Sequence, residues 1–186
     1  MRIIGGQHRG LRLAEVGKGD GAAHLRPTPD RVRESLFNVL AGHGLPAGVR
    51  VLDLFAGTGA LGLEALSRGA EHVTFADNGR TAQRLIRDNL ARARREADAT
   101  LLGGDVRRLP PGAPCGLVFL DPPYGKSLGA PALAAARQGG WIGAGAVVVW
   151  EEASPQEPPE GFALLDRRRY GDTHLTLLEA PGEPVV

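Results

Sequence analysis

Residues 51–62 read VLDLFAGTGALG, an apolar run that passes directly into a glycine-rich turn. The apolar run predicts a buried strand over Val49 to Phe55, and the residues after the turn predict a helix over Ala60 to Arg68. Gly69 is expected to end that helix, as glycine commonly does. A strand, a glycine turn and a helix in this order are typical of α/β folds that bind a ligand at the turn.

Strands and helices alternate through the rest of the chain. Further strands are predicted at residues 72–76, 100–102, 117–120 and 146–150, and helices at residues 81–94 and 130–138. The last two strands, at residues 162–170 and 174–179, are joined by Gly171-Asp172 and are predicted to pair as an antiparallel hairpin. This pattern predicts an α/β fold with a doubly wound, seven-stranded, mostly parallel Rossmann-like sheet.

The N-terminal residues differ from the rest, because they are rich in arginine, glycine and histidine and have little apolar periodicity. Leu11 and Leu13 allow a short strand or hairpin there. We therefore divide the chain into an N-terminal arm, residues 1–27, and a Rossmann-like domain, residues 28–186. Thr28 is predicted to cap the first helix of the domain, with Pro29 at the first helical position.

Arginine supplies nearly all of the positive charge, since Lys18 and Lys126 are the only lysines. The net charge is only +1, so it identifies no partner by itself, and a GC-rich genome would also account for the arginines. The planar guanidinium group nevertheless suits phosphates and base edges. Six arginines of the arm and of the outward face of the first helix are therefore predicted to hold a nucleic-acid backbone: Arg2, Arg9, Arg12, Arg26, Arg31 and Arg33.

Other features of the composition restrict the setting. The single cysteine, Cys115, excludes an internal disulfide and suits a reducing compartment. No apolar stretch approaches the roughly 20 residues that span a bilayer, and the N-terminus has no apolar signal core. We therefore expect a cytoplasmic protein.

A second functional segment, Asp121-Pro122-Pro123-Tyr124, follows the predicted strand at residues 117–120. The two prolines end the strand, because neither donates to a sheet ladder. In open α/β sheets, ligands bind at the carboxyl ends of the strands. A flat ring can stack on Tyr124 there while its exocyclic amino group donates to Asp121 and to the Pro122 carbonyl. The segment therefore predicts chemistry on the amine of a nucleobase.

Acids at the ends of the first three strands predict a cofactor with an adenosine-like half. Asp53 lies beside the glycine turn, where its carboxylate would repel a pyrophosphate and attract the ammonium group of a methionine moiety. Asp77 follows Gly57 by about 20 residues, the spacing of an acid that binds ribose hydroxyls. Asp105 follows the third strand and can accept a hydrogen bond from an adenine amino group.

Two alternatives remain open for these residues. Gly57, Gly59 and Gly62 also satisfy the G-x-G-x-x-G pattern of nicotinamide enzymes, and Asp77 suits either cofactor. In a purely structural interpretation, Asp53 caps a turn and the glycines serve tight packing.

Together these residues resemble the class I S-adenosylmethionine-dependent methyltransferases and, within them, the RsmD-type 16S rRNA guanine-N2 methyltransferases. The resemblance runs nearly end to end, through residues 2–10, 25–38, 53–70, 121–124 and 170–173. The two N-terminal segments are the most selective, whereas the segment at Asp121 is shared by many amino-methyltransferases. In one departure, the family usually has Glu followed two residues later by Asp after the second strand, where this chain has Asp77 and Gly79.

The resemblance implies methyl transfer from S-adenosylmethionine to N2 of guanine 966 of 16S rRNA. It implies a monomer that acts on an assembling small ribosomal subunit, needs no metal and holds the rRNA through the six arginines. The catalytic residues that it implies are Asp121, Pro122, Pro123 and Tyr124. The cofactor-binding residues that it implies are Asp53, Phe55, Gly57, Gly59, Asp77, Asn78, Asp105 and Val106.

Neighbouring enzyme classes remain as alternatives. A DNA or other RNA amino-methyltransferase would act on an adenine or cytosine amine, although the DNA enzymes usually carry an extra target-reading domain, for which this chain has little room. A protein glutamine methyltransferase usually has Asn in place of Asp121. The methyltransferase interpretation depends on one spatial expectation, that the loops after Phe55 and after Leu120 open on a common cavity.

Overall fold

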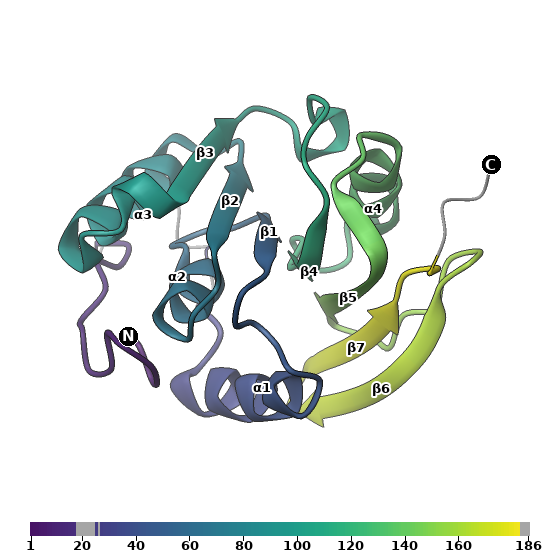
Figure 1. The fold of residues 1–186 in the computed structure, drawn as a ribbon, viewed down its shortest axis with the longest axis horizontal. Helices are drawn as coiled ribbons and strands as arrows, with labels where there is room; N and C mark the ends of the chain where they lie inside the picture. The colour runs from purple at the N-terminus through teal and green to yellow at the C-terminus, as the bar shows by residue number, and fades with distance from the viewer. Residues whose placement is uncertain (18–24, 26, 183–186) are drawn as a thin grey trace.

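A computed structural model describes residues 1–17, 25 and 27–182, and it contains one seven-stranded sheet (Figure 1). The strands are β1 (Arg50–Leu54), β2 (His72–Asp77), β3 (Ala99–Gly103), β4 (Cys115–Leu120), β5 (Ile142–Glu152), β6 (Ala163–Tyr170) and β7 (Thr173–Glu179). The helices are α1 (Asp30–Gly42), α2 (Ala60–Ser67), α3 (Arg80–Ala93) and α4 (Gly129–Gln138), with short 3-10 helices η1 (Glu96–Asp98) and η2 (Val106–Arg108).

The order of the strands across the sheet is β3-β2-β1-β4-β5-β7-β6. The five strands from β3 to β5 are parallel, and β7 pairs antiparallel with both β5 and β6. The chain therefore winds outward from β1 to one edge and then returns to β4 beside it. The predicted doubly wound sheet with a terminal antiparallel hairpin is confirmed.

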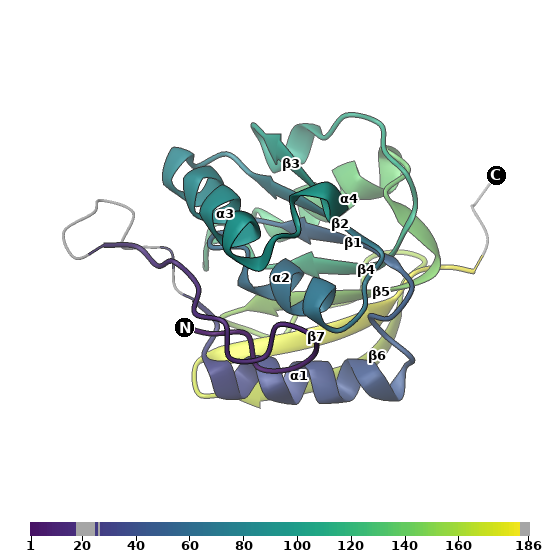
Figure 2. The same cartoon turned by 60° about the vertical axis from the view of Figure 1, so that its left-hand side comes forward.

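Alternate residues of the central strands face two separate cores, as the period of a strand requires. Leu117 and Phe119 of β4 belong to a core with α1, α2 and α3, whereas Val118 and Leu120 belong to a core with α4. Figure 2 shows α2 and α3 on the near side of the sheet and α4 behind it. Because β4 is buried on both faces, it reads as a continuous apolar run rather than an alternating one.

The N-terminal arm forms a hairpin that packs on the domain. Arg2 and Arg12 form an antiparallel bridge, and Ile3 and Leu13 are buried in the same core as α2. The side chain of Asn89, on α3, bonds to both backbone groups of Ala14 and also donates to the Thr58 carbonyl of the glycine turn. Asn89 therefore links the arm to the loop after β1.

The start of α1 differs from the prediction. The N-cap position is Pro29, and no side chain caps the helix. The Thr28 hydroxyl instead donates to Glu151 at the end of β5, at 3.1 Å. Because the helix begins at Asp30, Thr28 lies one residue before the N-cap position, and the predicted cap does not form.

Among the residues that the structure describes, no helix is both long and apolar enough to cross a membrane.

Candidate active site

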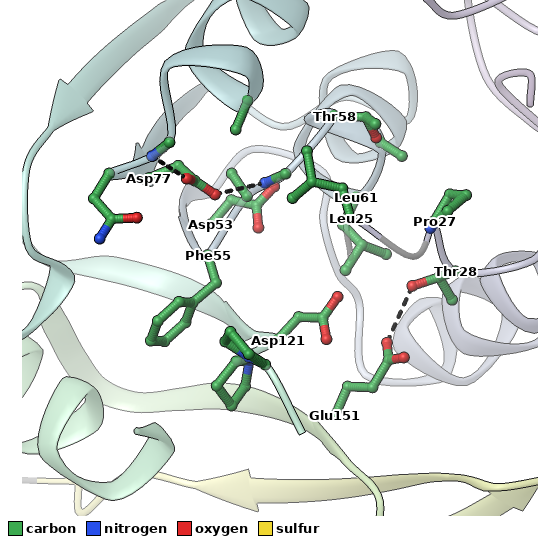
Figure 3. Close-up of a pocket in the computed structure, with 18 of the residues that line it drawn as sticks. Leu25, Pro27, Thr28, Asp53, Phe55, Thr58, Leu61, Asp77, Asp121 and Glu151 are labelled. Atoms are coloured by element: carbon green, nitrogen blue, oxygen red, sulfur yellow. Dashed lines mark hydrogen bonds between the residues drawn. The ribbon is translucent and has the colours of Figure 1, made fainter. Parts of the chain in front are cut away.

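A cavity of about 730 Å³ lies at the carboxyl ends of β1, β2, β4 and β5. Leu54 of β1 pairs directly with Leu120 of β4, so the loops that follow these residues are neighbours. Both loops line the cavity, and the expectation of a shared opening is confirmed. Among the lining residues are four acids, Asp53, Asp77, Asp121 and Glu151 (Figure 3). The volume lies within the range of small-molecule sites.

Asp53 is buried at the end of β1 and fixes the start of α2. Its Oδ2 accepts a hydrogen bond from the backbone N–H of Gly62 at 3.0 Å, while its side chain also lines the cavity. Burial raises the pKa of this carboxyl well above its usual value, and the Gly62 bond opposes that rise. The structural and the ligand-binding interpretations of Asp53 are therefore compatible, because a carboxylate has acceptor sites for both.

Asp77 holds the two loops that border this half of the cavity. Its Oδ2 accepts from the N–H of Gly57 at 3.0 Å, and its Oδ1 accepts from the N–H of Gly79 at 2.8 Å. The shorter aspartate thus fixes both the glycine turn after β1 and the loop after β2. Each oxygen keeps a further lone pair toward the cavity, which ribose hydroxyls can use.

The turn after β1 requires its glycines for two different reasons. Gly59 has φ +80°, a conformation that L side chains rarely adopt, and a Cβ on Gly62 would lie 2.3 Å from the Phe75 ring. Directly after β1, before these glycines, lies the cavity-lining residue Phe55 with φ +57°, an uncommon value for a residue other than glycine. Such backbone strain concentrates at functional sites, and the apolar pattern of the sequence gives no sign of it.

Three predicted cofactor residues, Gly59, Asp105 and Val106, do not line the cavity. The Asp105 carboxylate accepts three side-chain hydrogen bonds from Arg107 at 2.7–3.2 Å, which lower its pKa to about 2. Val106 is buried in the core of the α4 face. The adenine contact of Asp105 and the cofactor contact of Val106 stay predictions, whereas Gly57 and Asn78 do line the cavity.

Asp121 stands apart from the other acids because its carboxyl group bonds to no other residue in the described parts of the chain; only its backbone N–H is engaged, by the Leu54 carbonyl. Burial is the main cause that raises its pKa well above the usual value, and the neighbouring charges of Glu151 and Asp53 add to the rise. The carboxyl oxygens are thus free to accept hydrogen bonds from a ligand.

Tyr124 lines the cavity next to Asp121 and is held by its hydroxyl group. The hydroxyl donates to Glu151 at 2.9 Å and bonds to the Thr173 hydroxyl at 2.9 Å. Thr173 belongs to the Tyr170–Thr173 segment that was noted in the sequence, so the β6–β7 hairpin positions this ring. Burial raises the pKa of Tyr124 above its usual value, which keeps the hydroxyl protonated.

Sequence reasoning missed Glu151. Its carboxylate accepts from Tyr124 and from Thr28, and the side chain is only 7% exposed while lining the cavity. The signal was present, because an acid at the end of a parallel strand is what identified Asp53, Asp77 and Asp121. The predicted fifth strand ended at Trp150, two residues before the observed end of β5 at Glu152.

The arginines predicted to bind RNA differ in their exposure to solvent. Arg2, Arg9, Arg12 and Arg31 are exposed, although Arg2 also pairs with Asp30 at 3.5 Å. Arg26 lies outside the described residues.

The structure corrects the prediction for Arg33. It is fully buried, and its guanidinium group donates to the backbone carbonyls of Thr28 and Arg2 and pairs with Glu64. Glu64 in turn accepts from the backbone N–H groups of Ile4 and Gly5. A guanidinium enclosed in this way cannot reach RNA, so the prediction that Arg33 faces outward is wrong. The residue ties the arm and α1 to α2.

Comparison with known proteins identifies the family. The family model described as conserved hypothetical protein 95 matches residues 1–179. The Escherichia coli K12 protein "Ribosomal RNA small subunit methyltransferase D" is 39% identical over 197 residues, covering 98% of this chain and 92% of that protein. The chain belongs to the RsmD-type methyltransferase family. The Haemophilus influenzae protein of the same description is 35% identical and covers 92% of this chain and 89% of its own.

Solved structures place the fold in the same family. The Escherichia coli structure "Putative methyltransferase yhhF" has a TM-score of 0.85 and 34% identity, covering 98% of this chain and 99% of that one. The nicotinamide interpretation of the glycine turn therefore loses its support.

The cavity residues suit S-adenosylmethionine, the methyl donor that the RsmD-type family implies. Asp53 offers a carboxylate beside the glycine turn for an ammonium group, and Asp77 offers one for ribose hydroxyls. Phe55 and Leu61 add apolar surface to this half of the cavity. In the described parts of the chain, no group of three His, Cys, Asp or Glu side chains could hold a metal ion.

Proposed function

We propose that this protein methylates the exocyclic N2 amine of a guanine in 16S rRNA, with S-adenosylmethionine as the methyl donor. The observation that carries the proposal is the Asp121 carboxyl group, which has no partner among the described residues and faces the same cavity as Asp53 and Asp77. The similarity to proteins described as small-subunit rRNA methyltransferases supports rRNA as the substrate. The family resemblance supplies the position, guanine 966.

The chemical problem is that an exocyclic amine is a poor nucleophile, because its lone pair is delocalised into the ring. When bound, S-adenosylmethionine supplies an electrophilic methyl group. Asp121 and the Pro122 carbonyl accept the two amine hydrogens, which favours a pyramidal nitrogen with its lone pair directed at the methyl carbon. The methylated nitrogen is acidic, and the carboxylate of Asp121 lies ready to accept its proton.

Positioning supplies much of the remaining rate enhancement. Tyr124 stacks on a base that has left its neighbours, and the bonds of its hydroxyl to Glu151 and Thr173 fix the plane of the ring. Pro123, next to it, lines the cavity and limits the freedom of the segment. Holding two reactants in a reactive geometry is worth up to about 7–11 kcal/mol.

The exposed arginines of the arm and of α1 hold the rRNA backbone in this proposal. Replacing Arg9 and Arg31 together by alanine should weaken binding to small-subunit RNA and flatten its salt dependence. The slope of log affinity against log salt is expected to fall by about one to two, because each lost phosphate contact removes about 0.7–0.9. An unchanged slope would place these side chains outside the interface; a matched control is Arg87→Ala on the exposed side of α3.

The deciding experiment measures incorporation of radiolabelled methyl groups into small-subunit particles and into free 16S rRNA, followed by nucleoside analysis. N2-methylguanosine is the expected product, with assembling particles as the better substrate and a cytoplasmic monomer as the active form. Methylated adenosine or cytidine would instead identify another amino-methyltransferase and overturn the proposal.

A further inference from the structure

Glu151 and Asp121 lie side by side at the cavity end of neighbouring strands. Leu120, the last residue of β4, pairs with Trp150 of β5, so Asp121 and Glu151 each directly follow one member of this last pair. Parallel neighbours are separated by about 4.8 Å, and residues in register project from the same face of the sheet. Figure 3 shows both carboxyl groups pointing into the same part of the cavity.

The environment of Glu151 keeps it an acceptor. Tyr124 donates to one of its oxygens and Thr28 to the other, and no ion pair to Glu151 is found among the described residues. Hydroxyl donors favour the carboxylate over the protonated acid, although burial raises the pKa of Glu151. A carboxylate has about four acceptor sites, so two hydroxyl donors leave capacity for a ligand donor.

Two neighbouring acceptors match only one of the candidate bases. Guanine presents two adjacent donors, the ring N1–H and the N2 amine. Adenine and cytosine present an amine beside a ring nitrogen that carries a lone pair, so one carboxylate would face an acceptor. A buried acceptor that lacks its donor costs free energy, so a second carboxylate disfavours adenine and cytosine. A site that bound only the amine would not distinguish the three bases.

We propose that Glu151 is a specificity-determining residue that accepts the N1–H of the target guanine, while Asp121 accepts a hydrogen of its N2 amine. The inference rests on the proposed function, because it concerns the same base in the same cavity. It explains why a second acid lines the cavity at this strand end with no ion-pair partner in the described parts of the chain. It also assigns the discrimination against adenine and cytosine amines to one side chain.

The test compares guanine with 2-aminopurine at the target position, in small-subunit particles whose 16S rRNA contains a ligated synthetic segment. The analogue keeps the reacting amine at the same carbon but has a lone pair in place of N1–H. The wild-type protein should prefer guanine by at least about 100-fold in kcat/KM. In Glu151→Gln the preference should fall below about 10-fold, because the amide group can donate to the analogue.

Thr28→Val provides the control for a merely structural role. It removes a hydroxyl that supports Glu151 but leaves the carboxylate, so the preference for guanine should stay near the wild-type value even if turnover falls. A Glu151→Gln variant that kept the full preference would overturn the inference. Equal methylation of both particles by the wild-type protein would also overturn it, and that result does not require the variant to fold.

The proposed function fails in a different way. It fails if the wild-type protein forms no N2-methylguanosine on particles that contain guanine. The inference on Glu151 is contradicted while the proposed function stands if N2-methylguanosine forms but the base at the target position does not matter.

Discussion

The two halves of the cavity use carboxylates in opposite ways. In the half formed by β1 and β2, Asp53 accepts from a backbone N–H of α2, and Asp77 accepts from backbone N–H groups of the two loops. In the half formed by β4 and β5, Glu151 accepts only from side-chain hydroxyls, and the Asp121 carboxyl group bonds to no described residue. Acids at equivalent places in one sheet thus anchor the backbone on one side, and on the other side they accept from side-chain hydroxyls or from no described residue.

The difference separates the acids that hold the cavity in shape from the acids that are available to a ligand. A carboxylate bonded to backbone groups fixes a loop, and its removal leaves those groups unsatisfied. A buried carboxylate without a partner destabilises the fold and is retained for a ligand, the usual trade-off between stability and function. The two halves should therefore respond differently to removal of an acid.

The largest expected effect comes from Asp121→Ala. Single-turnover methyl transfer to small-subunit particles should fall by about 1,000-fold, because the acceptor for the amine is lost. Affinity for S-adenosylmethionine, measured by calorimetry, should change by less than about threefold, since no loop depends on this side chain. Asp88→Ala, at an exposed position on α3, serves as the control. Near wild-type turnover in a folded Asp121→Ala protein would remove the contrast between the halves.

Asp77→Asn should weaken cofactor affinity more than turnover, the reverse of Asp121→Ala. The amide has one acceptor oxygen for the two N–H groups of Gly57 and Gly79, so one of them loses its partner. Cofactor affinity is expected to weaken by about 10- to 100-fold, and the free energy of unfolding to fall by about 1–3 kcal/mol. Turnover at saturating cofactor should stay within a few-fold of wild type. A large loss of turnover with unchanged affinity would contradict the anchoring role.

The cofactor half was largely predictable from sequence because its signals are local. A strand, a glycine turn and an acid at a fixed spacing specified the loops after β1 and β2, and the apolar runs specified the strands. The one exception is the strained backbone of Phe55, which leaves no trace in apolar patterning. The contacts that turn Asp77 into an anchor are short-range consequences of that same turn.

The base half was predicted less completely because its contacts join distant segments. Glu151 meets Thr28 across 123 residues and Tyr124 across 27. Arg33 was assigned to the surface from its helical position alone, yet the arm folds over that face and buries it against Glu64. Periodicity identifies the side of a helix that faces the sheet, but not a segment from elsewhere in the chain that covers the opposite side.

The pH dependence of turnover provides a further test of the difference between the two halves of the cavity. Burial is the main cause that raises the pKa values of Asp121 and Glu151, and the charge of Glu151 raises the pKa of Asp121 further. Protonation of this pair therefore removes its acceptors at a higher pH than for exposed acids. Single-turnover rates should therefore decline about tenfold per unit as pH falls below the raised pKa. In Glu151→Gln the decline should move to lower pH, because the repelling charge is gone. A wild-type decline near pH 4, the ordinary range of an exposed carboxyl, would contradict the arrangement.

The smallest expected effect is on thermal stability. Its sign tests whether the Asp121 carboxylate destabilises the folded protein. A carboxyl group with a raised pKa in the folded state contributes stability below its unfolded pKa, near 3.9, and that contribution is lost as pH rises through the folded pKa. Asp121→Asn carries no such charge, so its Tm at neutral pH should exceed the wild-type value by a few degrees. Each kcal/mol corresponds to about 2–4 °C in a chain of this size.

The difference in Tm should shrink as pH falls toward 4, where both side chains are neutral. Asp105→Asn is the control of opposite sign, because Arg107 lowers the pKa of Asp105 to about 2. Its carboxylate contributes stability above the unfolded pKa, so that variant should lose a little stability at neutral pH. If Asp121→Asn also lost stability at neutral pH, Asp121 would have to have a partner in the fold, and the contrast between the two halves of the cavity would fail.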